Sequence, residues 1–92
     1  MERNYDFYGL TGEQESIARD LYENNKKYSG GYTLEEVDND MLDSFIENAK
    51  EDGDEEYLAF LTDARDLDAE LYTLTDHLGG FSQPIGEIAI FE

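Results

Sequence analysis

The sequence holds 92 residues, a length that suits one small domain rather than two. Its 24 Asp and Glu residues against 6 Lys and Arg residues give a formal net charge of −18, which disfavours direct contact with nucleic acid or a membrane surface and predicts a basic protein partner. The absence of cysteine excludes disulfides and thiolate catalysis, while 39% hydrophobic residues supply the apolar material of a folded core.

A short strand and a helix are expected in the first third of the chain. Residues 4–8 are rich in Tyr and Phe, which favours a strand. Thr11 and Gln14 have the form of a capping box, in which each side chain accepts a hydrogen bond from the other residue's backbone N–H. Apolar residues then recur at helical spacing before the pair Gly30–Gly31, so the first helix is expected over about residues 12–28.

Two further helices are expected in the middle of the chain. Thr33 and Glu36 repeat the capping pattern, which predicts a helix over about residues 34–51. From Tyr57 to Leu78 apolar residues recur at steps of three and four, which predicts a third helix over about residues 54–78 with a narrow packing seam. The other helices cover this seam, or part of it forms a homodimer contact, so a monomer and a homodimer both stay open.

The end of the chain returns to strand character. Residues 85–91 are rich in β-branched and aromatic residues. A lone strand leaves backbone groups unpaired, so the two terminal strands are expected to pair with each other or with a second copy of the chain. The expected fold class is α+β, mainly α: three helices with short terminal strands in one acidic domain over residues 1–92.

The negative charge concentrates in residues 35–76, which hold sixteen acidic residues and only Lys50 and Arg65 as bases. On the expected helices the acids fall mostly three or four positions apart and form two ridges, with a charge spacing near that of phosphates along a DNA strand. Like charges at these steps destabilise a helix, so their presence without interspersed lysines favours a binding role. The candidate partner-binding residues, including two tyrosines as aromatic anchors, are Glu36, Asp40, Asp43, Glu47, Glu51, Glu56, Asp63, Asp66, Glu70, Tyr32 and Tyr57.

The acidic charge is also compatible with roles that involve no protein partner. An ordinary solvated surface and adaptation to high salt both produce acid-rich faces, and they stay open. A calcium loop of the EF-hand type beginning at Asp52 would place Tyr57 where the turn needs Gly and Asp63 where a bidentate Glu belongs. No metal and no other cofactor is therefore expected.

Catalysis is not expected either. His77 is the single histidine, and its expected place at the end of the third helix suits a charge interaction with the helix dipole. The serines lack the glycine context of a nucleophile elbow, and the glycine pairs lack the spacing and the Lys of a phosphate-binding loop. The chain is expected to be non-enzymatic.

On size, lack of cysteine and the ridges from Glu36 to Glu51 and from Asp63 to Glu70, the chain resembles the small acidic DNA-mimic inhibitors of phages and mobile elements. These inhibitors share no common fold or motif, so the resemblance transfers no residue by position. It implies an inhibitor that blocks the basic DNA- or RNA-binding groove of a host defence protein, either a CRISPR effector or a restriction enzyme.

An immunity protein or antitoxin that neutralises one basic nuclease toxin is the alternative, and a subunit that assembles through the seam is a third hypothesis. The first residues lack the layout of a secretion signal and no apolar run reaches the length of a membrane span, so a cytoplasmic location is expected.

Overall fold

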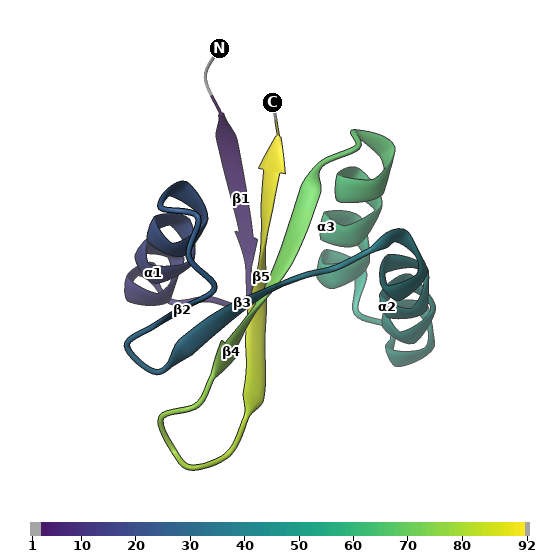
Figure 1. Cartoon of the computed structure of the whole chain (residues 1–92). Coiled ribbons are helices and arrows are strands. Elements are labelled where there is room, and N and C mark those ends of the chain that lie inside the picture. Colours follow the sequence, from purple (N-terminus) through teal and green to yellow (C-terminus); the bar gives the residue numbers. More distant parts are fainter. Residues whose placement is uncertain (1–2, 92) are drawn as a thin grey trace.

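The computed structural model describes residues 3–91, which form three helices and a five-stranded antiparallel sheet (Figure 1). The strand order across the sheet is β1-β5-β4-β3-β2. In chain order the elements are β1 (Asn4–Tyr8), α1 (Gly12–Glu23), β2 (Tyr28–Ser29), β3 (Tyr32–Glu36), α2 (Asn39–Asp52), α3 (Glu55–Asp66), β4 (Glu70–Asp76) and β5 (Gln83–Phe91).

The two terminal strands lie side by side, as one of the two sequence-based alternatives proposed. β1 pairs antiparallel with β5, from Asn4 opposite Phe91 to Tyr8 opposite Glu87. A Cβ atom at Gly86 would lie only 2.2 Å from the carbonyl oxygen of Tyr8, so the close approach of the two strands there requires glycine.

The expectation of a mainly α fold is wrong, because 43% of the described residues are helical and 31% lie in strands. Residues 32–36 form β3 and residues 70–76 form β4, although both segments were expected inside helices. Tyr and Thr recur in both segments and favour extended backbone. β4 pairs with β3 on one side and β5 on the other, and this cross-strand pairing outweighs the helix-like spacing of Leu71 and Leu74.

The first and third helices are shorter than expected. α1 ends at Glu23, and Asn25 adopts a left-handed backbone with φ of 55°, which interrupts the helix before the expected end near residue 28. α3 ends at Asp66, followed by Asp68 with φ of 54°. Asn and Asp tolerate this conformation better than other residues with a side chain, so short polar residues end both helices.

The sheet is the middle layer of three, with α1 on one face and α2 and α3 on the other (Figure 1). Each face buries its own apolar cluster. The cluster beneath α1 consists of Ala18, Leu21, Leu34, Leu74, Ile88 and Ile90. The cluster beneath α2 and α3 consists of Val37, Leu42, Ile46, Ala49, Phe60, Leu61, Ala64, Leu71 and Ala89.

The packing seam expected on a third helix does not form. Leu71 and Leu74 lie in β4 and are buried on opposite faces of the sheet, while Leu67 and Leu78 are exposed. The dimer contact proposed for the helical seam therefore loses its structural basis. None of the helices within residues 3–91 combines the length and apolar character that a bilayer span requires.

Candidate functional site

The longest run of aligned acidic residues lies on α2. The carboxylate of Asp38 caps this helix by accepting a hydrogen bond from the backbone N–H of Met41 at 2.8 Å, so the helix begins five residues later than the Thr33 pattern predicted. Leu42, Ile46 and Ala49 face the sheet, while Asp40, Asp43, Glu47 and Glu51 are exposed. Four of the five residues expected on this ridge therefore share one solvent-facing side of α2.

A second acidic set lies on α3, the neighbour of α2 in the same layer. Gly53, with φ of 71°, ends α2, and Asp54 then caps α3. The two helices run antiparallel (Figure 1). Glu56, Asp63 and Asp66 are exposed on α3. Because both helices cover the same face of the sheet, the two sets belong to one outer surface, which we call the acidic layer.

Few positive charges offset the acidic layer. Twelve acidic residues lie between Asp38 and Asp68, and the bases in that segment are Lys50 and Arg65. Lys50 Nζ lies 3.9 Å from Glu47 Oε1, and Arg65 Nε lies 3.5 Å from Asp66 Oδ1. Both pairs are exposed, so their mutual attraction is screened by water and most of the negative charge of the layer remains uncompensated.

Glu36 and Glu70 do not belong to the acidic layer, although the sequence placed each at an end of a ridge. Glu36 ends β3 and Glu70 begins β4. Glu70 accepts a hydrogen bond from the hydroxyl of Tyr22, which belongs to α1. Glu36 lies opposite Tyr72 in the β3–β4 register. Both acids therefore face the α1 side, and the sheet separates them from α2 and α3.

The two predicted aromatic anchors also lie away from the surface of the acidic layer. Tyr32 begins β3 and packs against the cluster beneath α1. Tyr57 belongs to α3, but its ring stacks on Tyr8 with a centroid separation of 4.7 Å and packs against the cluster beneath that helix. The sequence placed Tyr57 at the start of the seam expected on the third helix, and in the structure its ring is partly buried and points inward from α3.

A buried carboxylate that the sequence pattern did not single out lies under α3. Glu87 is 7% exposed and accepts a hydrogen bond from the hydroxyl of Tyr57. Burial raises the pKa of Glu87 above its ordinary value, and the Tyr57 hydrogen bond opposes this effect. Burial and the same hydrogen bond raise the pKa of Tyr57. The sequence signal that could have identified Glu87 was its position as an acid within the apolar run 85–91.

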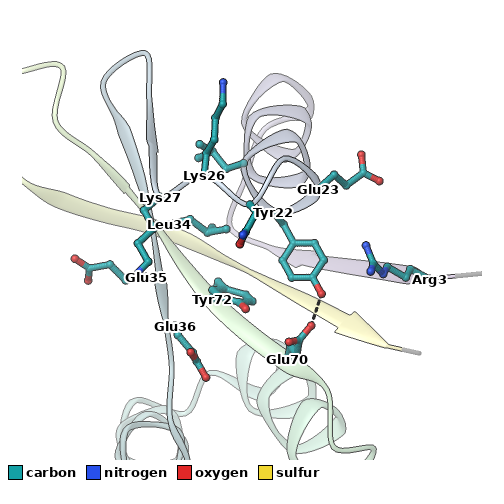
Figure 2. Close-up of a pocket in the computed structure, with 12 residues that line it drawn as sticks. Arg3, Tyr22, Glu23, Lys26, Lys27, Leu34, Glu35, Glu36, Glu70 and Tyr72 are labelled. Atoms are coloured by element: carbon teal, nitrogen blue, oxygen red, sulfur yellow. Dashed lines mark hydrogen bonds between the residues drawn. The ribbon is translucent and has the colours of Figure 1, made fainter.

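A groove of about 750 Å³ opens on the α1 side, where the sequence predicted no site (Figure 2). Its lining includes Arg3, Tyr22, Lys26, Glu36, Glu70 and Tyr72. The hydrogen bond to Glu70 is the main cause that raises the pKa of Tyr22 to about 12. Burial, and then the charges of Glu70 and Glu36, raise the pKa of Tyr72. These residues come from separate segments of the chain, so no local motif could have announced the groove.

His77 does not cap a helix, contrary to expectation. It follows β4, and its Nε2 lies 2.8 Å from the hydroxyl oxygen of Thr33 while its Nδ1 lies 2.9 Å from that of Ser82. Its backbone N–H donates to the carbonyl of Gly31 at 2.8 Å. These bonds connect the loop after β4 to the β2–β3 hairpin, so His77 has a structural role.

Within residues 3–91, no group of three or more His, Asp or Glu side chains is arranged to hold a metal ion. The candidate site is therefore a surface of carboxylates without an evident metal position. No protein-family model matches the sequence, and no curated protein or solved structure matches it with statistical significance, so the assignment of function depends on the chemistry of the chain itself.

Proposed function

We propose that this protein is a non-enzymatic inhibitor whose acidic layer imitates nucleic-acid phosphates. It would occupy the basic DNA- or RNA-binding groove of a host defence protein, either a CRISPR effector or a restriction enzyme, in the cytoplasm of the cell that carries it. The observation that carries the proposal is the exposed row Asp40, Asp43, Glu47 and Glu51 on one side of α2.

The dimensions of this row support the mimicry. From Asp40 to Glu51 the helix rises about 16 Å, which gives one charge per roughly 5 Å, against about 3.4 Å between phosphates along one DNA strand. Glu56, Asp63 and Asp66 extend the charge to a second helix, and packed helix axes lie about 8–10 Å apart. The row is shorter than the sequence predicted, because Glu36 is not part of it.

The support beneath the row makes it a preorganised ligand. Leu42, Ile46 and Ala49 are at most 6% exposed and anchor α2 on the sheet. Carboxylates carried on a packed helix lose less conformational freedom on binding than carboxylates on a flexible tail. A basic groove would release counterions from the acidic layer much as it does from DNA, so inhibition would be stoichiometric and competitive.

Affinity capture from a host lysate, followed by addition of duplex DNA, tests this mechanism. We expect the captured protein to bind nucleic acid and to be released by the added duplex. We also expect affinity to fall steeply between 0.1 M and 1 M salt, since the screening length shrinks from about 10 Å to about 3 Å. A captured partner that neither DNA nor RNA releases would contradict phosphate mimicry.

An immunity protein against one basic nuclease toxin remains the second candidate, because apolar side chains border the acidic layer. Met41, near the start of α2, is 40% exposed, and Leu67, just after α3, is 67% exposed. The antiparallel helices bring these positions to the same end of the layer. Apolar anchors surrounded by charge favour recognition of one partner by shape, and a complex that resists high salt would support this candidate.

A further inference from the structure

The groove on the α1 side exists because the two faces of the sheet are covered unequally. A single helix of 12 residues, α1, covers one face, whereas α2 and α3 together cover the other (Figure 1). The groove is lined by residues of β3 and β4 and by the last turn of α1. The resulting groove of about 750 Å³ lies within the usual size range of small-ligand sites, about 300–1,000 Å³.

Two carboxylates and two aromatic rings line this groove. Glu36 lies directly across the β3–β4 register from Tyr72, and Glu70 precedes Tyr72 by two residues on the same strand face. Directly opposed strand residues have Cβ atoms about 4.5–5.5 Å apart. The ring of Tyr22 lies 5.5 Å from that of Tyr72, at an interplanar angle of 59°, and its hydroxyl fixes the carboxylate of Glu70 (Figure 2).

The chain itself places a guanidinium group against one of these rings. Cζ of Arg3 lies 5.4 Å from the ring centroid of Tyr22, within the range of a cation–π interaction. The carboxylate of Glu36, by contrast, forms no hydrogen bond or ion pair with another residue in the range 3–91. The groove therefore already accepts one planar cation and keeps a second acidic position without a partner in the described chain.

We propose that this groove binds the guanidinium group of an arginine side chain from a partner protein, held by Glu36 and Glu70 against the ring of Tyr72. Guanidinium fits this arrangement better than ammonium, because it is planar, stacks on aromatic faces and carries five N–H donors that reach two carboxylates together. The site goes beyond the proposed function, since it lies across the sheet from the acidic layer and recognises one side chain.

Nuclear magnetic resonance titration with N-acetyl-arginine amide tests the assignment directly. We expect saturable shifts of the backbone amide signals of Glu36 and Tyr72, and binding at least tenfold weaker for N-acetyl-citrulline amide, which has nearly the same shape without the charge. Equal binding of the two probes, or shifts confined to α2 and α3, would overturn the proposal. Free arginine binding more than tenfold tighter than the capped probe would do so too, by making a metabolite the ligand.

Matched charge variants separate this groove from general attraction to an acidic protein. We expect Glu36→Gln to weaken binding of the arginine probe about tenfold, and the exposed control Glu47→Gln on α2 to change it less than twofold. Glu36 is exposed, so folding should survive its replacement, which circular dichroism verifies. Equal losses in both variants would overturn the site.

Replacement of the ring tests the aromatic part of the assignment. Tyr72→Phe keeps the ring, so we expect binding of N-acetyl-arginine amide within about twofold of the unmodified protein, and loss of binding in Tyr72→Leu. A Tyr72→Leu variant that folds and still binds would contradict ring stacking. None of these results bears on release of a captured partner by DNA, so this proposal and the proposed function fail independently.

Discussion

The face of the sheet covered by α1 differs from the face covered by α2 and α3 in the amount of helix above it and in the charges that this helix presents. The outer side of α2 and α3 carries many acids and the two bases Lys50 and Arg65, and an apolar cluster lies beneath both helices. The α1 side mixes Arg3, Arg19, Lys26 and Lys27 with acids and leaves a groove open. Under the two proposals above, the two sides of one sheet would bind different ligands: an extended basic groove on one side and a single cationic side chain on the other.

We expect the largest effects from mutations in the two apolar clusters, because each face of the sheet buries such a cluster. Leu21, on the buried side of α1, is 2% exposed, and Leu61, in α3, is fully buried. We expect Leu21→Ala and Leu61→Ala each to lower the free energy of unfolding by about 2–5 kcal/mol, measured by denaturant titration. A much smaller loss for Leu21→Ala would show that the α1 layer is not part of one cooperative core.

Charge reversal on the acidic layer should have the next largest effect, on binding rather than on stability. We expect Asp43→Lys with Glu47→Lys to weaken the complex with the captured partner about a hundredfold, or about 2.7 kcal/mol at 1.36 kcal/mol per tenfold. The control Glu13→Lys with Asp20→Lys changes two exposed acids of α1 by the same charge and should cost less than tenfold. Equal losses, measured by calorimetry, would show that only net charge matters.

The buried acid under α3 should make stability depend on pH in a way that exposed acids do not. Because burial raises the pKa of Glu87 in the folded state, the folded chain holds that proton more tightly than the unfolded chain. The contribution of Glu87 to stability is therefore fully present below the ordinary carboxyl pKa and is lost as pH rises through the raised pKa of the folded state. We expect Glu87→Gln to remove this loss, as followed by unfolding between pH 4 and pH 8.

The exposed acid Glu47 supplies the control for that measurement. Glu47→Gln changes the formal charge equally at an exposed position and serves as the matched control for Glu87→Gln. If Glu87→Gln and Glu47→Gln gave the same profile, burial of Glu87 would not govern its titration.

Removal of the cap of α2 should cost less than a core mutation. The Asp38 carboxylate satisfies one backbone N–H at the start of this helix, and we expect Asp38→Ala to lower the free energy of unfolding by about 1 kcal/mol. Thr11→Ala removes the equivalent cap of α1 and should cost a similar amount. Thr33→Ala, at the false capping position in β3, should leave helix content unchanged by circular dichroism.

The smallest expected effect is a change in stability, which distinguishes an acidic surface that serves binding from one that stabilises the fold. Asp43 lies three residues after Asp40 and four before Glu47, so its neutralisation relieves repulsion within α2. We expect Asp43→Asn to raise the free energy of unfolding by a few tenths of a kcal/mol while weakening the partner complex. A variant that lost stability would indicate that the acid serves the fold.

Local sequence signals gave correct predictions where the backbone forms its hydrogen bonds with residues nearby in the chain. The capping box of Thr11 and Gln14 is present, with hydrogen bonds of 3.2 Å and 2.9 Å, and α1 begins at Gly12 as expected. The same kind of pattern failed at Thr33 and Glu36, because both residues pair with β4 in the sheet. A capping pattern shows that a segment could begin a helix. Strand pairing at the same segment can satisfy the backbone hydrogen bonds instead.

By itself the sequence determined the charge of the molecule, the start of α1, the strand character of its two ends and the exposed acids of α2, because these depend on composition and on contacts within a few residues. Only the tertiary structure decided that residues 70–76 form a central strand and that Glu36 and Glu70 face α1. It also decided that Tyr57 donates a hydrogen bond to Glu87. The physical reason is that strand partners and buried hydrogen bonds join residues far apart in the chain, as Tyr22 joins Glu70, and local spacing carries no record of them.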